Sequence, residues 1–161
     1  MCLDGSPAGL YFSKGYGSGR NKTVFYFLGG GWCKGKYPKD VAYDCYNRSF
    51  TKLGSTENWA DTSTSIDKTF AADPEKDVIF YNWNRIFVIY CDGTGHQGYI
   101  ESPLNISGKS IYFKGHYNTM THLDWALRKL PPEIMDSFAL YGFSAGGQAV
   151  FTWIETFKNI I

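Results

Sequence analysis

The sequence predicts an α/β fold built around a largely parallel, doubly wound sheet. Three observations indicate this class: short β-branched and aromatic runs alternate with helical segments, glycine-rich turns follow the runs directly, and the element order is strand, strand, helix, strand, helix. At 161 residues the chain is long enough for one domain with its own core, and no repeat divides it. We therefore expect residues 1–161 to form a single domain.

The first strand-like segments lie near the N-terminus. Residues 9–13 and 23–28 flank a glycine-rich turn at 14–20, which favours an antiparallel hairpin. The second run ends abruptly at three consecutive glycines, residues 29–31. Residues 34–77 are polar and lack a sustained period, so we expect short helices and loops there.

The second half of the chain has clearer periodicity. Residues 84–90 form another β-branched and aromatic run, followed by a glycine-containing loop. Apolar residues recur at helical spacings over 115–130, and two prolines stop that segment. Residues 137–141 read as a short buried strand, and 148–158 as a helix.

Charge and hydrophobicity exclude two classes of function. The formal net charge is +1, and Lys and Arg are scattered, so no field strong enough to recruit nucleic acid or an anionic membrane is expected. The longest apolar run, residues 86–91, is far shorter than the roughly 20 residues that cross a bilayer. We expect neither nucleic-acid binding nor a membrane span.

Four cysteines occur at Cys2, Cys33, Cys45 and Cys91. The even count without a C-x-x-C pair fits two disulfides better than a zinc site, so no metal is expected. Four reduced thiols buried in the core are the alternative.

Three N-x-S/T sequons, at Asn21, Asn47 and Asn105, bear on the compartment. Such sites are glycosylated only in secreted or lumenal proteins. With the cysteines they favour an extracellular protein, although the sequence opens without signal-peptide features, which predicts a true start upstream.

Residues 142–146 match G-x-S-x-G, in which small flanking residues permit a sharp strand-to-helix turn that lifts Ser144 clear of the sheet. The pattern is short enough to occur by accident as a structural turn. Its context favours a nucleophile, because an apolar strand precedes it and a helical segment follows.

A serine nucleophile needs donors for the oxyanion, usually backbone N–H groups. In α/β-hydrolases one donor comes from a loop after a central strand and another from the residue after the nucleophile. Here these are Gly31 or Trp32, and Ala145. A merely flexible glycine turn is the alternative interpretation.

The usual triad also needs an acid and a histidine after the nucleophile. Glu155 is the only acidic residue after Ser144, and no histidine follows it. His96, His116 and His122 all precede Ser144, and we expect each of them to be a surface or loop residue. The chain as given therefore cannot contain a complete triad in the usual order, and we expect the fold to be incomplete at the C-terminus.

Five blocks resemble the pectin acetylesterases of plants and the related Notum carboxylesterases. The blocks run in order across nearly the whole chain: Cys2-Leu3-Asp4-Gly5-Ser6-Pro7-Ala8-Gly9, Gly29-Gly30-Gly31-Trp32-Cys33, Tyr81-Asn82-Trp83-Asn84-Arg85, Tyr90-Cys91-Asp92-Gly93 and Gly142-Phe143-Ser144-Ala145-Gly146-Gly147. The third and fourth blocks are closer to the pectin acetylesterases. One departure is Leu28, which stands where family members usually carry a Glu.

The resemblance implies roles for individual residues. Ser144 would be the nucleophile; Gly31, Trp32 and Ala145 would form the oxyanion hole. Trp32 would also wall the acyl pocket. The implied substrate-binding loop consists of Asp92, Gly93 and Thr94, and the implied disulfides are Cys2–Cys91 and Cys33–Cys45.

The activity implied is that of a secreted serine carboxylesterase that deacetylates a polysaccharide through an acyl-serine intermediate. Such chemistry needs no metal or organic cofactor. The resemblance also implies that the triad Asp and His lie in a C-terminal half that is missing here, so we expect this chain alone to be inactive. Two alternatives remain: an inactive esterase-like binding or structural module, and a Notum-like deacylase acting on a lipidated protein.

Overall fold

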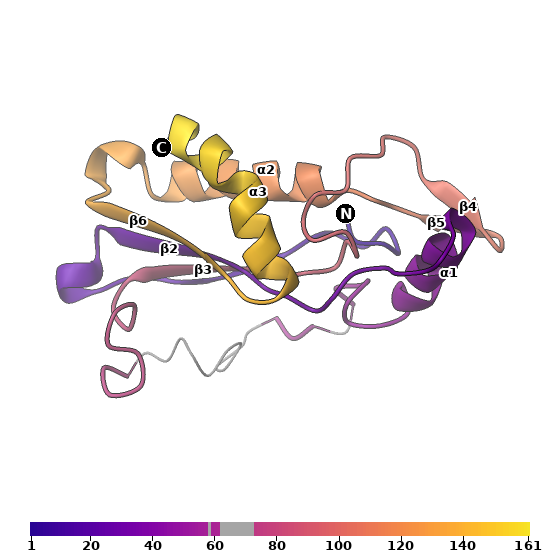
Figure 1. Ribbon diagram of the computed structural model, residues 1–161. Helices are drawn as coiled ribbons and strands as arrows, with labels where there is room; N and C mark the ends of the chain where they lie inside the picture. Colours follow the sequence, from indigo (N-terminus) through magenta and orange to yellow (C-terminus); the bar gives the residue numbers. More distant parts are fainter. Residues whose placement is uncertain (58, 62–72) are drawn as a thin grey trace.

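The computed structural model describes residues 1–57, 59–61 and 73–161. These residues form a mixed four-stranded sheet in the order β1-β3-β2-β6, a separate two-stranded sheet and three α-helices (Figure 1). The elements are β1 (Leu10–Ser13), η1 (Gly17–Gly19), β2 (Lys22–Phe27), α1 (Pro38–Arg48), β3 (Asn84–Val88), β4 (Leu104–Ile106), β5 (Lys109–Ile111), α2 (Gly115–Lys129), η2 (Pro132–Ile134), β6 (Ser137–Gly142) and α3 (Ala145–Ile160).

The predicted hairpin between the first two strands is wrong. β3 lies between them: Val88 is opposite Leu10 of β1 in an antiparallel pair and opposite Phe27 of β2 in a parallel pair. Every residue of β3 is buried, so this strand is stabilised by a central position in which both of its edges are hydrogen-bonded. β6 then pairs in parallel with the other edge of β2.

Asn84, at the start of β3, explains how β1 and β2 can be separated. Its side-chain oxygen accepts a hydrogen bond from Gly15 N–H at 2.9 Å, and its amide nitrogen donates to the carbonyls of Arg20 (2.7 Å) and Lys22 (3.0 Å). The glycine-rich connection is therefore fastened to β3 and not folded into a tight turn. Residues 81–85, the third block of the family resemblance, therefore have a structural role. They lie at the start of β3, at the opposite end of the strands from the candidate site.

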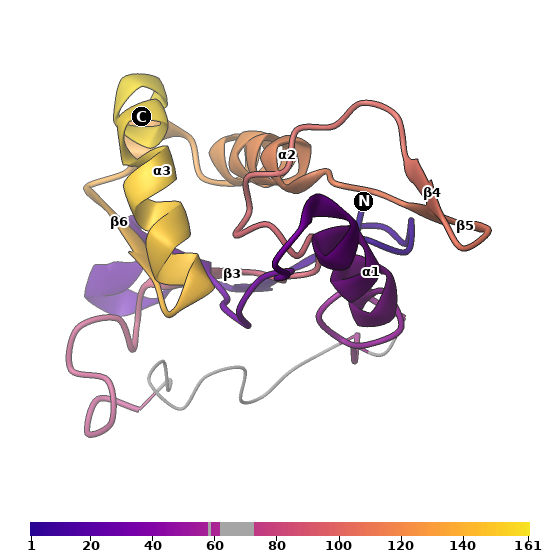
Figure 2. The same ribbon diagram turned by 45° about the vertical axis from the view of Figure 1, so that its right-hand side comes forward.

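α2 and α3 cover one face of the sheet (Figure 2). Alternate residues of β2 divide between the faces. Phe25 and Phe27 pack under the two helices, whereas Val24 and Tyr26 belong to a second cluster on the other face, which includes the first residue of α3. The helical side of the core is completed by Ile86, Val88, Leu123, Ala126, Ala149, Trp153 and Phe157.

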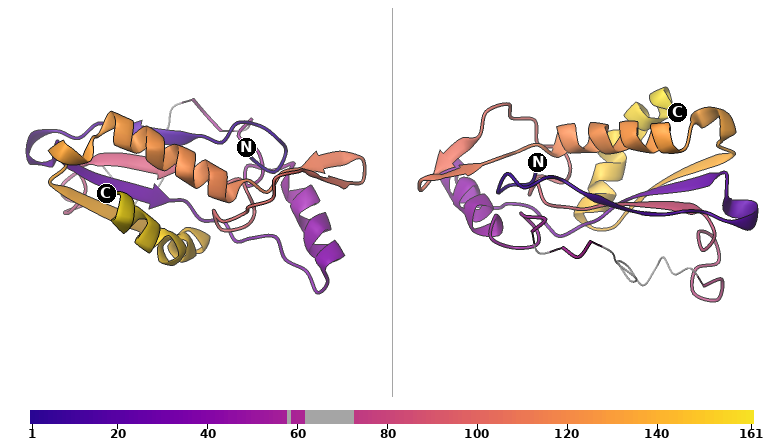
Figure 3. Two further views of the ribbon diagram at one scale, coloured as in Figure 1. Left: turned by 90° about the horizontal axis from the view of Figure 1, so that it is seen from above. Right: turned by 180° about the vertical axis from the view of Figure 1, so that it is seen from behind.

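A small second core lies at one end of the molecule, where α1 packs against the β4–β5 hairpin (Figures 1 and 3). Leu3, Cys45 and Ile111 are fully buried there. Disulfides join Cys33 to Cys45 and Cys2 to Cys91, which is the pairing that the resemblance implies. The β4–β5 hairpin was not expected from the sequence, because its strands are only three residues long.

The helix predicted over 115–130 is confirmed as α2, and the helix predicted over 148–158 begins three residues earlier, at Ala145. The polar stretch 34–77 contains α1, and part of it lies outside the described residues. No helix in the described part of the chain is long and apolar enough to cross a membrane.

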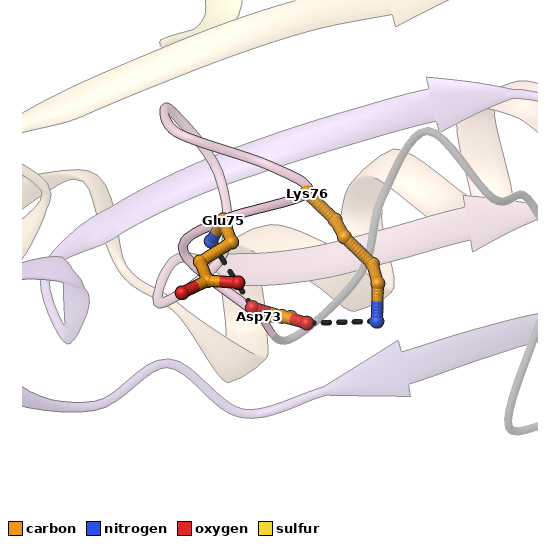
Figure 4. A network of polar contacts seen from close by, with 3 residues as sticks. All are labelled: Asp73, Glu75 and Lys76. Atoms are coloured by element: carbon orange, nitrogen blue, oxygen red, sulfur yellow. Dashed lines mark hydrogen bonds and ion pairs between the residues drawn. The ribbon is translucent and has the colours of Figure 1, made fainter.

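The chain approaches β3 through an exposed polar turn (Figure 4). The Asp73 carboxylate accepts from Glu75 N–H at 3.0 Å and pairs with Lys76 at 2.8 Å. The hydrogen bond from Lys76 lowers the pKa of Asp73. Because the pair is on the surface, it orders the turn locally and adds little to global stability.

Candidate active site

Ser144 stands between β6 and α3 at a sharp turn. Its backbone has φ 56° and ψ −122°, a positive φ that non-glycine residues rarely adopt, and its side chain is exposed. Ala145, the first residue of α3, is fully buried. Its N–H belongs to the first helical turn, where amides have no intrahelical acceptor and the helix dipole favours negative charge.

The motif glycines make this turn possible. A Cβ on Gly146 would stand 2.0 Å from the Phe27 carbonyl oxygen, and a Cβ on Gly142 would stand 2.2 Å from the Gly146 carbonyl oxygen. Both neighbours are main chain, which cannot move aside as a flexible side chain can. The helix start therefore lies directly against the end of β2, and the Ser144 hydroxyl is kept out of the core.

The glycine loop after β2 lies against the same turn. A Cβ on Gly29 would be 2.3 Å from the Phe143 carbonyl oxygen and 3.1 Å from Ser144 Cβ. Gly30 and Gly31 have φ values of 154° and 69°. The structure thus brings together the loop and the serine turn that the sequence analysis singled out separately.

Two residues that the sequence analysis did not assign to the site hold this loop from behind. Arg48 Nη2 donates to the Gly30 carbonyl at 2.5 Å, and Tyr90 Oη donates to the Gly31 carbonyl at 2.6 Å. Tyr90 belongs to a resemblance block, but Arg48 lies in the polar stretch. The signal for Arg48 was the Cys33–Cys45 disulfide, which brings α1 to the glycine loop.

The predicted substrate-binding loop divides into two parts. Asp92 is buried, and its carboxylate accepts from the N–H groups of Thr94 and His96, both at 3.2 Å. Gly93 and Thr94 instead line a pocket of about 310 Å³. Asp92 therefore shapes the loop, whereas the two residues after it face the pocket.

The pocket extends from the glycine loop to α3. Trp32, which is 46% exposed, forms one wall. Gln148, one turn beyond Ser144 on α3, forms another wall. The remaining lining residues are Cys33, Val41, Cys45, Gly95 and Phe113.

The expectation of a surface or loop position holds for His96, which lies in a loop although it is only 2% exposed. It is wrong for His122, which lies on α2 and is 6% exposed. His96 Nε2 lies 2.8 Å from the Leu28 carbonyl. A carbonyl can only accept, so Nε2 carries the proton. Burial lowers the pKa of His96, against the opposing charge of Asp92.

His96 is therefore a neutral structural residue that fastens its loop to the end of β2. Its own carbonyl accepts from the Trp153 indole N–H at 3.0 Å, which ties the loop to α3. Leu28, where the family usually has Glu, supports the loop through its backbone carbonyl, while its side chain packs in the core.

The described residues hold no group of three or more His, Cys, Asp or Glu side chains arranged to bind a metal ion. Of the sequon asparagines, Asn47 and Asn105 are exposed and Asn21 is half-buried. The site thus offers a serine hydroxyl on a strained turn, neighbouring backbone amides and an adjacent pocket.

Comparison with known proteins identifies the family. A model described as Pectinacetylesterase matches residues 1–161. Pectin acetylesterase 5 of Arabidopsis thaliana is 31% identical over 159 residues, which are 99% of this chain and 35% of that protein. The chain therefore spans about a third of the length of this relative.

Notum proteins are also similar. A Danio rerio relative named inactive palmitoleoyl-protein carboxylesterase notum1b is 36% identical over 110 residues, covering 60% of this chain and 73% of that protein. A solved structure of the Wnt deacylase Notum from Drosophila matches with a TM-score of 0.83 and 22% identity, covering 98% of this chain and 44% of that one. This likeness confirms the α/β-hydrolase fold, and the match over all 161 residues shows that the chain belongs to the pectinacetylesterase family.

Proposed function

We propose that this chain carries the nucleophile and the oxyanion hole of a secreted serine carboxylesterase that removes acetyl groups from a polysaccharide. The observation that carries the proposal is Ser144, exposed at a positive-φ turn in contact with the glycine loop. Strained backbone at a strand-to-helix turn is typical of a reactive residue.

The chemistry follows from this geometry. Ser144 Oγ attacks the ester carbonyl carbon, and the carbonyl oxygen becomes negatively charged. The N–H groups of Gly31, Trp32 and Ala145 would donate to that oxyanion. The C–O bond to the alcohol then breaks, and the alcohol leaves with the proton that the Ser144 hydroxyl gave up. Water then releases acetate from the acyl-serine intermediate, and no metal or organic cofactor is required.

An acetylated polysaccharide is the substrate we favour. The family model that matches all 161 residues is described as Pectinacetylesterase. The pocket of about 310 Å³ beside Trp32 is at the small end of the range for ligand sites, which suits a short acyl group. Trp32 offers an exposed ring against which a sugar can pack, and Gly93 and Thr94 line the same pocket.

We also propose that residues 1–161 are one part of a single esterase domain, whose further part supplies the triad Asp and His. In the described residues, β6 lies at an edge of the four-stranded sheet. On α3, Phe151 is 85% exposed, and an apolar pocket of about 320 Å³ opens between β6 and α3. Such a face is suited to pack against further protein.

An extracellular location is supported by the two disulfides, which persist in oxidising compartments. The exposed asparagines of two sequons, Asn47 and Asn105, are open to glycosylation. Peptide-N-glycosidase treatment of the secreted protein should lower its mass. Secreted protein of unchanged mass would contradict glycosylation.

The decisive experiment uses the complete gene product. Ser144→Ala should abolish turnover of p-nitrophenyl acetate and labelling by a fluorophosphonate probe, with an unchanged circular dichroism spectrum. Ser102→Ala, which removes an exposed hydroxyl from a loop, is the matched control. Turnover by Ser144→Ala at the wild-type rate would refute the assignment.

The second candidate is an inactive esterase-like binding module. It is favoured by the similarity to a relative named as inactive. Absence of fluorophosphonate labelling in the folded wild-type protein would support this candidate. A Notum-like activity would instead appear as release of a fatty acid from an acylated peptide, without release of acetate from acetylated pectin.

A further inference from the structure

We propose that Arg48 and Tyr90 are positioning residues for the oxyanion hole, which aim the N–H groups of Gly31 and Trp32 by holding the carbonyls on the other side of the same peptide units. The inference rests on the proposed function, because it assigns these two residues to the reaction that Ser144 would carry out.

The argument begins with peptide geometry. In a trans peptide unit the C=O and N–H bonds lie in one plane and point in opposite directions. The Gly30 carbonyl shares its unit with the Gly31 N–H, and the Gly31 carbonyl shares its unit with the Trp32 N–H. A hydrogen bond to each carbonyl therefore fixes the direction of the N–H across the unit.

These two hydrogen bonds are needed because the glycine loop alone cannot hold one backbone conformation. Gly30 and Gly31 have φ values of 154° and 69°, where only glycine rests comfortably, and glycine also has the most alternative conformations. Arg48 Nη2 at 2.5 Å and Tyr90 Oη at 2.6 Å remove that freedom. Preorganised donors are what make an oxyanion hole effective.

Tyr90 is itself held rigidly. It is fully buried, and its oxygen accepts from Gly95 N–H at 2.9 Å while its proton goes to Gly31. Burial, with the nearby Asp92 carboxylate, raises the pKa of Tyr90 to about 12. The phenol therefore remains a neutral donor at any pH at which an esterase works.

Arg48 is positioned by two contacts and by a nearby disulfide. Its guanidinium lies 5.3 Å from the centre of the Tyr90 ring, and its Nε donates to the Leu53 carbonyl at 3.1 Å. Cys45, three residues earlier on α1, is disulfide-bonded to Cys33 at the end of the glycine loop. Residues three apart share a helix face, so the disulfide brings Arg48 to the loop.

The first test is Tyr90→Phe in the complete gene product. Deleting an oxyanion-hole donor lowers kcat by roughly 10²–10³-fold, and losing its alignment should lower kcat by about 10-fold or more, with little change in KM. Tyr11→Phe is the matched control, because that hydroxyl also donates to a backbone carbonyl, that of Ala60, outside the site. The control should keep the wild-type kcat.

A second pair of variants tests Arg48. Arg48→Met removes both the charge and the donors, whereas Arg48→Lys retains a cation that can reach the Gly30 carbonyl. We expect kcat to fall by about 10-fold or more in Arg48→Met and to recover in part in Arg48→Lys. Arg128→Met, which breaks an exposed ion pair with Asp124 on α2, is the control.

A trifluoromethyl ketone separates positioning from a merely structural role. This inhibitor forms an oxyanion when a serine adds to it, so its Ki should rise in proportion to the loss of kcat/KM. A variant that is only less stable would have a lower melting temperature but unchanged kcat and Ki. If Tyr90→Phe does not fold, the Arg48 pair decides.

The outcomes distinguish this inference from the proposed function. If Ser144→Ala is inactive while Tyr90→Phe and Arg48→Met keep kcat within twofold of wild type, the positioning role is overturned and the esterase stands. If Ser144→Ala keeps full turnover, the proposed function fails and the positioning role fails with it. Loss of kcat with matched weakening of the ketone supports the inference.

Discussion

Gly146 at the start of α3 packs against the main chain of Phe27 at the end of β2, with room for a hydrogen but not for a methyl group. A Cβ at this position would stand 2.0 Å from the Phe27 carbonyl oxygen. This contact fixes the helix directly above the sheet end. The position of Ser144 therefore depends on the packing of a residue that has no side chain.

Gly146→Ala should destabilise the protein by about 3 kcal/mol or more, because the added methyl group would clash with the main chain of Phe27, which cannot move aside. Gly147→Ala is the matched control. Its Cβ would be 3.3 Å from the Gly142 carbonyl oxygen, and alanine favours a helix by about 1 kcal/mol over glycine. Urea midpoints of the complete gene product measure both effects. Equal midpoints for the two variants would contradict the packing argument.

The two disulfides should separate stability from activity. Cys2–Cys91 closes a sequence separation of 89 residues and Cys33–Cys45 one of 12. Constraint of the unfolded chain predicts that the paired Cys→Ala variants lose about 4–5 and about 3 kcal/mol, respectively. The Cys33/Cys45 variant should nonetheless show the larger fall in kcat, because α1 carries Arg48. A larger fall in the Cys2/Cys91 variant would refute this.

Acid should destabilise the protein through His122. Burial lowers the pKa of His122 to about 4 from an ordinary 6.5. The unfolded state therefore binds the proton more strongly between these values, and stability that is fully present above pH 6.5 is lost as pH falls toward 4. The size of the loss is about 3 kcal/mol.

His122→Gln tests this effect, since the amide can still donate to the backbone at Ala8, the acceptor for His122. The variant should lose less stability than wild type between pH 6.5 and 4 in urea titrations. His116→Gln, on the same helix, is the control and should retain the wild-type pH dependence because His122 is still present. An unchanged slope in His122→Gln would contradict the prediction.

Tyr90 should affect stability at alkaline pH. Its pKa of about 12 lies above the ordinary value of 10, so the folded state holds the proton more strongly. The stabilisation is full below pH 10 and is lost as pH rises toward 12, by about 3 kcal/mol in total. Tyrosinate absorbance should show a phenol that titrates near pH 12 and that Tyr90→Phe removes. Loss of an earlier-titrating phenol would contradict the assignment.

The sequence predicted those parts whose cause is local. The spacing of apolar residues and the following prolines define α2, and the small residues around Ser144 define the turn before α3. The cysteine pairing followed from the family resemblance, not from spacing. The pairing of β1 with β3 could not be predicted, because it depends on Asn84 side-chain hydrogen bonds across more than 60 residues.

The candidate site shows the same division. Ser144 and the glycine loop are recognisable from short motifs, but the support behind the loop comes from Arg48 and Tyr90, which only the folded chain brings together. His96 lies in a loop, as the sequence analysis expects, but its burial was not predicted. A histidine in a glycine-rich loop suggests exposure, yet its ring packs between Phe27 and Tyr90 because its carbonyl and Nε2 both find partners in the core.

The positive φ of Ser144 sets an evolutionary bias. A residue with a Cβ is held in this conformation at a cost of about 1–3 kcal/mol, which a glycine would not incur. In descendants that no longer need the hydroxyl, replacing Ser144 by glycine would therefore stabilise the fold. Selection for stability alone would favour such inactive proteins. Persistence of serine here across a lineage would thus be a sign that the hydroxyl is still in use.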